Sequence, residues 1–275
     1  MNLTDLDIER LLYRSSKVNR TQLKHRNTPD CRWNTKDVTK VFLAYMILMF
    51  VGMPVIVRII NAIFRFNVLS NVWQRCMILF VSLFVNVLIC LYIFYIVRIE
   101  HRQSIAALGL SLINLPENTK QGVKRYLITL PLIILAGFIT NQISNFYGLT
   151  PETQDVVKWL LEEKSIFILV CLIFFGTIIA PIIEEIIFRG FLQSALKNYF
   201  GERYAILTSA FLFAAVHMDM FVFLQIFILG MLLGYLYEKT KTLAASVIVH
   251  ILHNSLTMIF LLYFKYFLEG KVPVF

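Results

Sequence analysis

The chain has 275 residues, of which 58% are hydrophobic and only 16% are charged, and 24 of them are phenylalanine. Soluble domains average roughly half apolar and a quarter charged residues, so this composition excludes an ordinary soluble domain and indicates an integral membrane protein. The net charge of +9 does not indicate a nucleic-acid partner, because the cations gather in the N-terminal segment and in alternate loops, where they encode membrane topology. We therefore expect contact with a lipid bilayer and none with nucleic acid.

Seven apolar runs recur along the chain, at 41–60, 77–97, 126–144, 166–187, 204–218, 221–237 and 243–264. A helix of about 17 to 25 apolar residues crosses the hydrocarbon core of a bilayer, and a helix satisfies its own backbone hydrogen bonds there. The sequence therefore predicts an all-α polytopic membrane protein, a bundle of about 7–8 transmembrane helices.

The polar segments between these runs predict the topology. Residues 1–39 are basic and have no short apolar core with a small-residue cleavage site, so we expect a cytoplasmic tail, with a short amphipathic helix from Leu3 to Tyr13, rather than a cleaved signal peptide. Cations also mark the 98–125 and 189–203 segments as cytoplasmic, although Arg58, Arg65 and Arg75 in the first outer loop run against this rule. The prediction is a multi-pass protein of the plasma membrane with a cytoplasmic N-terminus.

Polar content divides the chain into three regions. After the tail at 1–39, residues 40–144 supply N-terminal transmembrane helices that contain almost no ionisable group. Residues 145–275 contain every intramembrane Glu and His, with the notable motifs within 180–255. We therefore expect the chemistry to lie in this C-terminal region. After Arg189 the segment alternates apolar and polar residues at helical spacing up to Gly201, which is typical of a helix on the membrane surface.

The stretch "IAPIIEEIIFRGFLQ" at 179–193 places three ionisable groups in an apolar run. A charge near the bilayer centre costs about 2.5 to 3.5 kcal/mol, so such residues usually face the protein interior and mark function. Glu185 and Arg189 are four residues apart and share a helix face, where they can pair, whereas Glu184 is turned away by about 100°. The spacing leaves Glu184 either as a free carboxylate or as a partner for a neighbouring helix.

Two later runs add imidazoles. "FLFAAVHM" carries Phe213 and His217 four residues apart, and "SVIVHILHNSL" carries His250 and Asn254 four apart, with His253 on the adjoining edge. A lone histidine in an apolar helix is most often a packed core residue. Three imidazoles, one unpaired carboxylate and one carboxamide on consecutive helices together indicate a functional site instead.

A straight-helix count does not bring these groups to one depth. Glu184 lies about 8 Å in from Arg189, whereas His217 lies about 21 Å in from Arg203. We therefore expect the helix that carries His217 to begin later than residue 204, to tilt or to kink.

The motifs "EEIIFR", "FAAVH" and "HILHN" occur in this order over roughly the last third of the chain. They resemble the EExxxR, FxxxH and HxxxN/D motifs of the CPBP intramembrane proteases, also called the Abi or CAAX protease family. Each motif alone is weak, and their order in three membrane-grade helices is specific. The resemblance implies a helical intramembrane endopeptidase with its active-site cavity inside the membrane.

The resemblance also implies roles for the residues. Glu184 would act with His217 to activate a water molecule for attack on a peptide carbonyl. His250 and Asn254 would stabilise the oxyanion that forms. Glu185, Arg189 and Phe213 would support the site.

The cofactor and the alternatives stay open at this stage. The favoured glutamate mechanism requires no cofactor, and the alternative is a zinc ion on Glu184, His217 and His250, although no HExxH motif is present. The expected partner is a membrane-associated peptide or protein substrate. The alternative function is a non-catalytic membrane binding or bacteriocin-immunity protein that keeps the site for structure or peptide capture. A proton-coupled transporter is disfavoured, because the sequence shows no internal repeat.

Overall fold

The computed structural model describes residues 31–64, 71–149 and 155–267. These residues form helices joined by short loops and include no strand, which confirms the all-α polytopic class. The expected helix from Leu3 to Tyr13 lies outside the described residues.

The first half of the chain contains α2 (Thr35–Ile47), η1 (Leu48–Gly52), α3 (Met53–Phe64), α4 (Asn71–Tyr95), η2 (Ile96–Glu100), η3 (Ile105–Leu108) and α5 (Leu115–Phe146). The second half contains α6 (Asp155–Glu162), α7 (Ile166–Phe174), η4 (Phe175–Ile179), α8 (Ala180–Glu185), η5 (Ile186–Gln193), α9 (Ser194–Ala215), α10 (Phe223–Thr240) and α11 (Leu243–Phe267). The segments η1, η2, η4 and η5 are π-helical, and η3 is a 3₁₀ turn.

Every predicted apolar run is helical over most of its length, with residues 216–218 and 221–222 outside the helices, and the count of membrane-length helices among the described residues is five. They are Thr35–Ile60, Cys76–Glu100, Leu115–Phe146, Ile166–Ala215 and Leu243–Phe267. The long Ile166–Ala215 stretch takes in two predicted spans, because the chain stays helical on both sides of a break at Gly201. The remaining predicted span, 221–237, is the shorter α10, whose last turn is polar.

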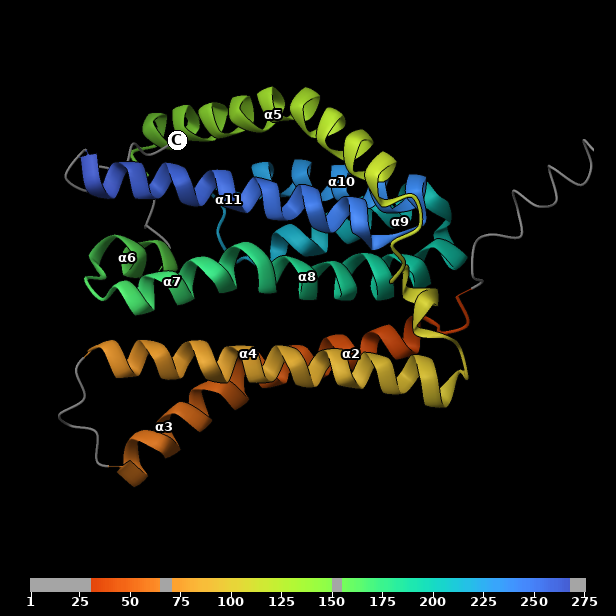
Figure 1. Cartoon of the computed structure of the whole chain (residues 1–275), viewed down its shortest axis with the longest axis horizontal. Coiled ribbons are helices and arrows are strands. Elements are labelled where there is room, and N and C mark those ends of the chain that lie inside the picture. The colour runs from red at the N-terminus through yellow and green to blue at the C-terminus, as the bar shows by residue number, and fades with distance from the viewer. Residues whose placement is uncertain (1–30, 65–70, 150–154, 268–275) are drawn as a thin grey trace, which may run out of the picture.

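The helices form layers around the Ile166–Ala215 stretch (Figure 1). On one side α2 and α3 pack against α4, and on the other side α5 covers α10 and α11. Between them α8 contacts both α4 and α11. The motif residues on α8, η5, α9 and α11 are thus brought to the middle of the bundle.

The path of the central helix differs from the sequence expectation in one respect. The segment after Arg189 was expected to lie on the surface, and this is wrong for its first half: residues 190–196 are buried, whereas residues 198–202 are exposed. The buried part is covered on both its apolar and its polar sides, because α9, α10 and the N-terminal segment pack around it. The expected interruption at Gly201 is confirmed: its φ of 76° lies in the left-handed region that glycine adopts without strain.

Two π-helical segments flank α8, which carries both glutamates of the EExxxR motif. A π-helical turn inserts one residue into the helix, changes the direction of the side chains after it, and occurs often at functional sites. The sequence contained no signal for these segments.

The last residues of the predicted tail belong to the packed structure. The Trp33 indole stacks on the Phe191 ring with centroids 5.6 Å apart, and its Nε1 donates to the Phe191 carbonyl at 2.9 Å. Asn198 donates to the Cys31 carbonyl at 2.8 Å. Helix α2 starts directly after this contact, so the N-terminal segment is tied to η5 and to the start of α9.

Candidate active site

A buried ion pair lies at the centre of the site. Arg189 Nη1 donates to Glu185 Oε1 at 2.9 Å across one helical turn, and both side chains are 0% exposed. Arg189 Nη2 also donates to the Gly230 carbonyl at 3.2 Å, and its guanidinium lies 4.3 Å from the centroid of the Phe213 ring. The motif arginine therefore joins η5, α9 and α10.

His250 lies between the two glutamates of the motif. Its Nδ1 is 3.0 Å from Glu185 Oε1, and its Nε2 is 3.6 Å from Glu184 Oε2. The His250 ring is buried, whereas the Glu184 side chain is 27% exposed. Glu185 is thus shared by Arg189 and His250, and Glu184 is the partly exposed carboxylate of this cluster.

The contact between His250 and Glu185 constrains the imidazole. Because a carboxylate only accepts hydrogen bonds, His250 Nδ1 is the donor to Glu185, which leaves His250 Nε2 turned toward Glu184.

His217 reaches the same region through Phe213. Its Nδ1 lies 2.7 Å from the Phe213 carbonyl oxygen, and its ring meets the Phe213 ring edge-on at 5.0 Å. The His250 ring meets the same Phe213 ring at 5.6 Å. Both imidazoles therefore contact the ring of Phe213, which brings His217 into the region of the glutamates although the straight-helix count placed it deeper than Glu184.

The pairing that the family resemblance implied is not made directly in this structure. Between the described side chains of Glu184 and His217 there is no hydrogen bond or ion pair, and the imidazole paired with Glu184 is that of His250. A catalytic hydrogen bond is often long in a substrate-free enzyme, so this geometry does not by itself remove His217 from the site.

Asn254 holds the π-helical segment before α8. Its Nδ2 donates to the Gly176 carbonyl of η4 at 2.9 Å. The carboxamide nitrogen carries two hydrogens, so one donor remains for another acceptor. Asn254 therefore positions η4 through one of its two carboxamide hydrogens.

One contact of His253 was missed by the sequence reasoning. Its Nδ1 lies 3.1 Å from the hydroxyl oxygen of Tyr126 on α5, and the two rings meet edge-on. The sequence placed His253 next to the helix face that carries His250. No spacing rule, however, connects His253 with a tyrosine 127 residues away. Through this contact α5 is joined to the helix that carries His250 and Asn254.

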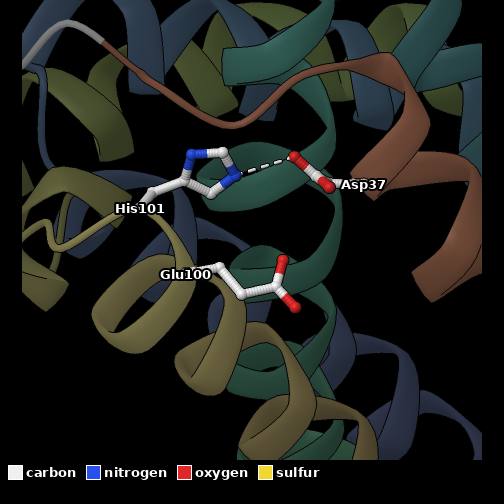
Figure 2. A group of neighbouring side chains, drawn as sticks. All are labelled: Asp37, Glu100 and His101. Atoms are coloured by element: carbon white, nitrogen blue, oxygen red, sulfur yellow. Dashed lines mark hydrogen bonds and ion pairs between the residues drawn. The ribbon is translucent and has the colours of Figure 1, made fainter.

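The residues that could hold a zinc ion do not gather as the zinc alternative requires. Among the described residues the one group of three whose ligand atoms lie within 4.8 Å of one another is Asp37, Glu100 and His101 (Figure 2). Glu184, His217 and His250 do not form such a group, and His217 Nδ1 already contacts a backbone carbonyl. As they lie, these three side chains do not fit a shared metal ion.

The Asp37 group is accounted for by its own contacts. Asp37 Oδ2 accepts from the Asn34 backbone N–H at 3.1 Å and lies 2.8 Å from His101 Nε2, and Oδ1 accepts from Lys40 at 3.3 Å. Asp37 thereby completes the N-terminal cap of α2 and ties it to the loop after η2. The Lys40 ammonium would also repel a cation placed there.

The comparisons with known proteins bear on the region that carries this site. Residues 166–256 match the family model described as type II CAAX prenyl endopeptidase Rce1-like. The chain is 32% identical over 134 residues to the membrane-embedded CAAX protease MroQ of Staphylococcus aureus, covering 46% of this chain and 51% of that protein. It is 28% identical over 112 residues to the putative membrane peptidase YdiL of Bacillus subtilis, covering 41% and 44%.

A third relative is the UPF0177 protein YaiF of Lactococcus lactis, at 28% identity over 149 residues, with 50% of this chain and 64% of that protein covered. No solved structure is significantly similar to the chain. The matched part spans about half the length of the first two relatives. By its motifs and by these matches, the site-bearing region of this membrane protein is similar to the Rce1-like CAAX protease family.

Proposed function

We propose that the chain is an intramembrane endopeptidase that hydrolyses a peptide bond in a membrane-associated peptide or protein. The observation that carries the proposal is the contrast within one motif: Glu185 is fully buried and doubly paired, whereas its neighbour Glu184 is partly exposed and lies 3.6 Å from His250. Burying this cluster is costly in a membrane protein, and a poised base is a function that accounts for the cost.

In the proposed reaction Glu184 takes a proton from a water molecule, whose oxygen attacks the peptide carbonyl carbon. The carbonyl oxygen becomes negatively charged, and donors on His250 and Asn254 stabilise it. Collapse of the tetrahedral intermediate breaks the C–N bond, and the proton passes from Glu184 to the leaving amine. Preorganised donors of this kind contribute about 2.7 to 4 kcal/mol each in other hydrolases. His217 is assigned to orient the water beside Glu184.

The proposal includes a metal-free mechanism, a plasma-membrane location and a cytoplasmic N-terminus. Its support is the dispersed arrangement of the would-be zinc ligands and the cations on the 98–125 and 189–203 segments. Peptidase activity that a strong chelator abolishes and added zinc restores would contradict the metal-free part.

The decisive experiment uses the purified full-length chain in detergent with a library of membrane-anchored peptides. Wild type should cleave some of them, and Glu184→Gln should reduce cleavage by at least about 10³-fold while the thermal unfolding temperature stays unchanged. Glu202→Gln, which removes an exposed carboxylate on α9, is the matched control and should remain active.

Cleavage that survives Glu184→Gln would overturn the assignment of the base. A folded wild-type chain that binds peptides from the library but cleaves none would favour the alternative, a non-catalytic membrane binding or bacteriocin-immunity protein. The bonds of His250 and Asn254 to Glu185 and Gly176 are compatible with such a structural use.

A further inference from the structure

A groove between α5 and α10 lies apart from the candidate active site. It has a volume of about 340 Å³ and is lined by Arg125, Ile128, Thr129, Leu132, Ile228, Met231, Leu232 and Tyr235. This volume is near the lower end of the roughly 300–1,000 Å³ range of small-molecule sites. None of its lining residues belongs to the three sequence motifs.

Polar and apolar groups are segregated along the groove. Arg125 is the last charged residue of α5, since residues 126–146 contain no Asp, Glu, Lys or Arg. Its guanidinium lies 4.7 Å from the centroid of the Tyr235 ring, one turn before the polar end of α10. Both groups therefore mark the same boundary between headgroups and hydrocarbon, where Arg and Tyr side chains are enriched.

Below this boundary the groove is apolar and open to the bilayer. Ile128 is 69% exposed, and Leu132 is also exposed on the rim, whereas Ile228 and Leu232 form a buried floor. The only other polar side chain, Thr129, already donates to the Arg125 carbonyl at 3.0 Å. Pro131 lies between the rim residues and lacks the N–H that would bond one turn back, which locally loosens α5.

Arg125 has no acidic partner among the described residues; the contact found for its guanidinium is the Tyr235 ring. Lys124 directly precedes Arg125 and Lys120 lies five residues before it, so three cations stand close together on α5. A cation at the headgroup level above an apolar groove is complementary to a lipid anion with its acyl chain. Basic pockets between transmembrane helices bind such headgroups.

We propose that this groove binds one anionic phospholipid, with its phosphate on Arg125 and one acyl chain along Ile128, Leu132 and Ile228. The lipid belongs to the leaflet that meets the N-terminal end of α5. It would fill the gap between α5 and α10 and so support the face of α5 whose Tyr126 contacts His253.

Native mass spectrometry of the full-length chain tests the proposal, with phosphatidylglycerol and phosphatidylcholine of matched acyl chains. Wild type should bind one phosphatidylglycerol about fivefold more tightly than phosphatidylcholine, which corresponds to about 1 kcal/mol for one cation. Arg125→Gln should abolish this preference and Arg125→Lys should retain most of it. Lys124→Gln is the matched control, because it removes an adjacent, exposed charge that does not line the groove.

Ile128→Trp tests the apolar part, because a large ring on this exposed rim fills the groove without disturbing the core; binding of both lipids should fall. Equal loss of the preference in Arg125→Gln and Lys124→Gln would overturn the proposal in favour of diffuse surface charge. Equal binding of the two lipids, or no effect of Ile128→Trp, would also overturn it. Displacement of phosphatidylglycerol by a prenylated peptide, blocked by Ile128→Trp, would identify the groove as a substrate site instead.

Discussion

Glu185 and Arg189 face each other across one helical turn at 2.9 Å, and neither side chain has exposed surface. Removing one partner of a buried pair leaves an uncompensated charge and typically costs about 3–5 kcal/mol. Glu185→Gln should therefore lower the thermal unfolding temperature in detergent markedly, because the buried Arg189 loses the negative charge that it pairs with.

Glu184→Gln is the matched control for this change, since it alters the adjacent residue in the same helix with the same chemistry. It should leave the unfolding temperature near that of wild type while peptidase activity is lost. Equal stabilities of the two variants would mean that the buried pair does not support the fold.

Asn254→Ala tests the link between the site and η4. The substitution removes the side-chain donor of the partly buried Gly176 carbonyl, and the loss of one hydrogen bond costs about 0.5–1.5 kcal/mol. We expect the unfolding temperature and the cleavage rate to fall together, measured by thermal unfolding and by the peptide assay. Thr257→Ala, whose exposed hydroxyl bonds only within α11, should change neither. Lost activity at full stability would show that the carboxamide acts on substrate and not on η4.

Gly190→Ala tests the close packing directly after Arg189. A Cβ at this position would lie 2.8 Å from the Leu108 carbonyl oxygen, a backbone atom that cannot move aside cheaply. We expect a destabilisation of about 1–3 kcal/mol, as for other overpacked core positions. Gly176→Ala is the control, because its Cβ would meet only the end of the Met258 side chain at 3.6 Å. If the two variants unfold at the same temperature, the close approach of η3 to η5 is not a constraint.

Much of the fold could be predicted from sequence patterns that lie within one helix. The apolar runs predict the helices, and the i, i+4 rule pairs Glu185 with Arg189 because both groups lie on one helix. The same rule cannot say which other helix approaches them. The sequence therefore gave no means to place His250 between the glutamates, or to find the contact between Tyr126 and His253.

The π-helical segments and the contact of Trp33 could not be predicted from the sequence either, because neither feature has a recognisable sequence pattern. An inserted residue in a helix leaves no mark in composition or period, yet it redirects every side chain that follows. Trp33 lies in a polar segment that the composition predicts to be a tail. The contact of its ring with Phe191 is evident only from the structure.

Trp33 gives the last prediction, because its side chain is 1% exposed and joins the N-terminal segment to η5. Trp33→Ala removes the stacked ring and the hydrogen bond to the Phe191 carbonyl, and should cost about 3–5 kcal/mol. Trp33→Phe keeps a ring and loses the Nε1 donor, so we expect a smaller cost of about 1 kcal/mol.

Phe146→Ala, at an exposed position, is the control and should have little effect in detergent. Thermal unfolding measures the stability of each variant. The cleavage rate in the peptide assay should fall in the same order as the stability, since η5 carries Arg189. If Trp33→Ala unfolds like wild type, the contact with Phe191 does not hold the N-terminal segment against the site.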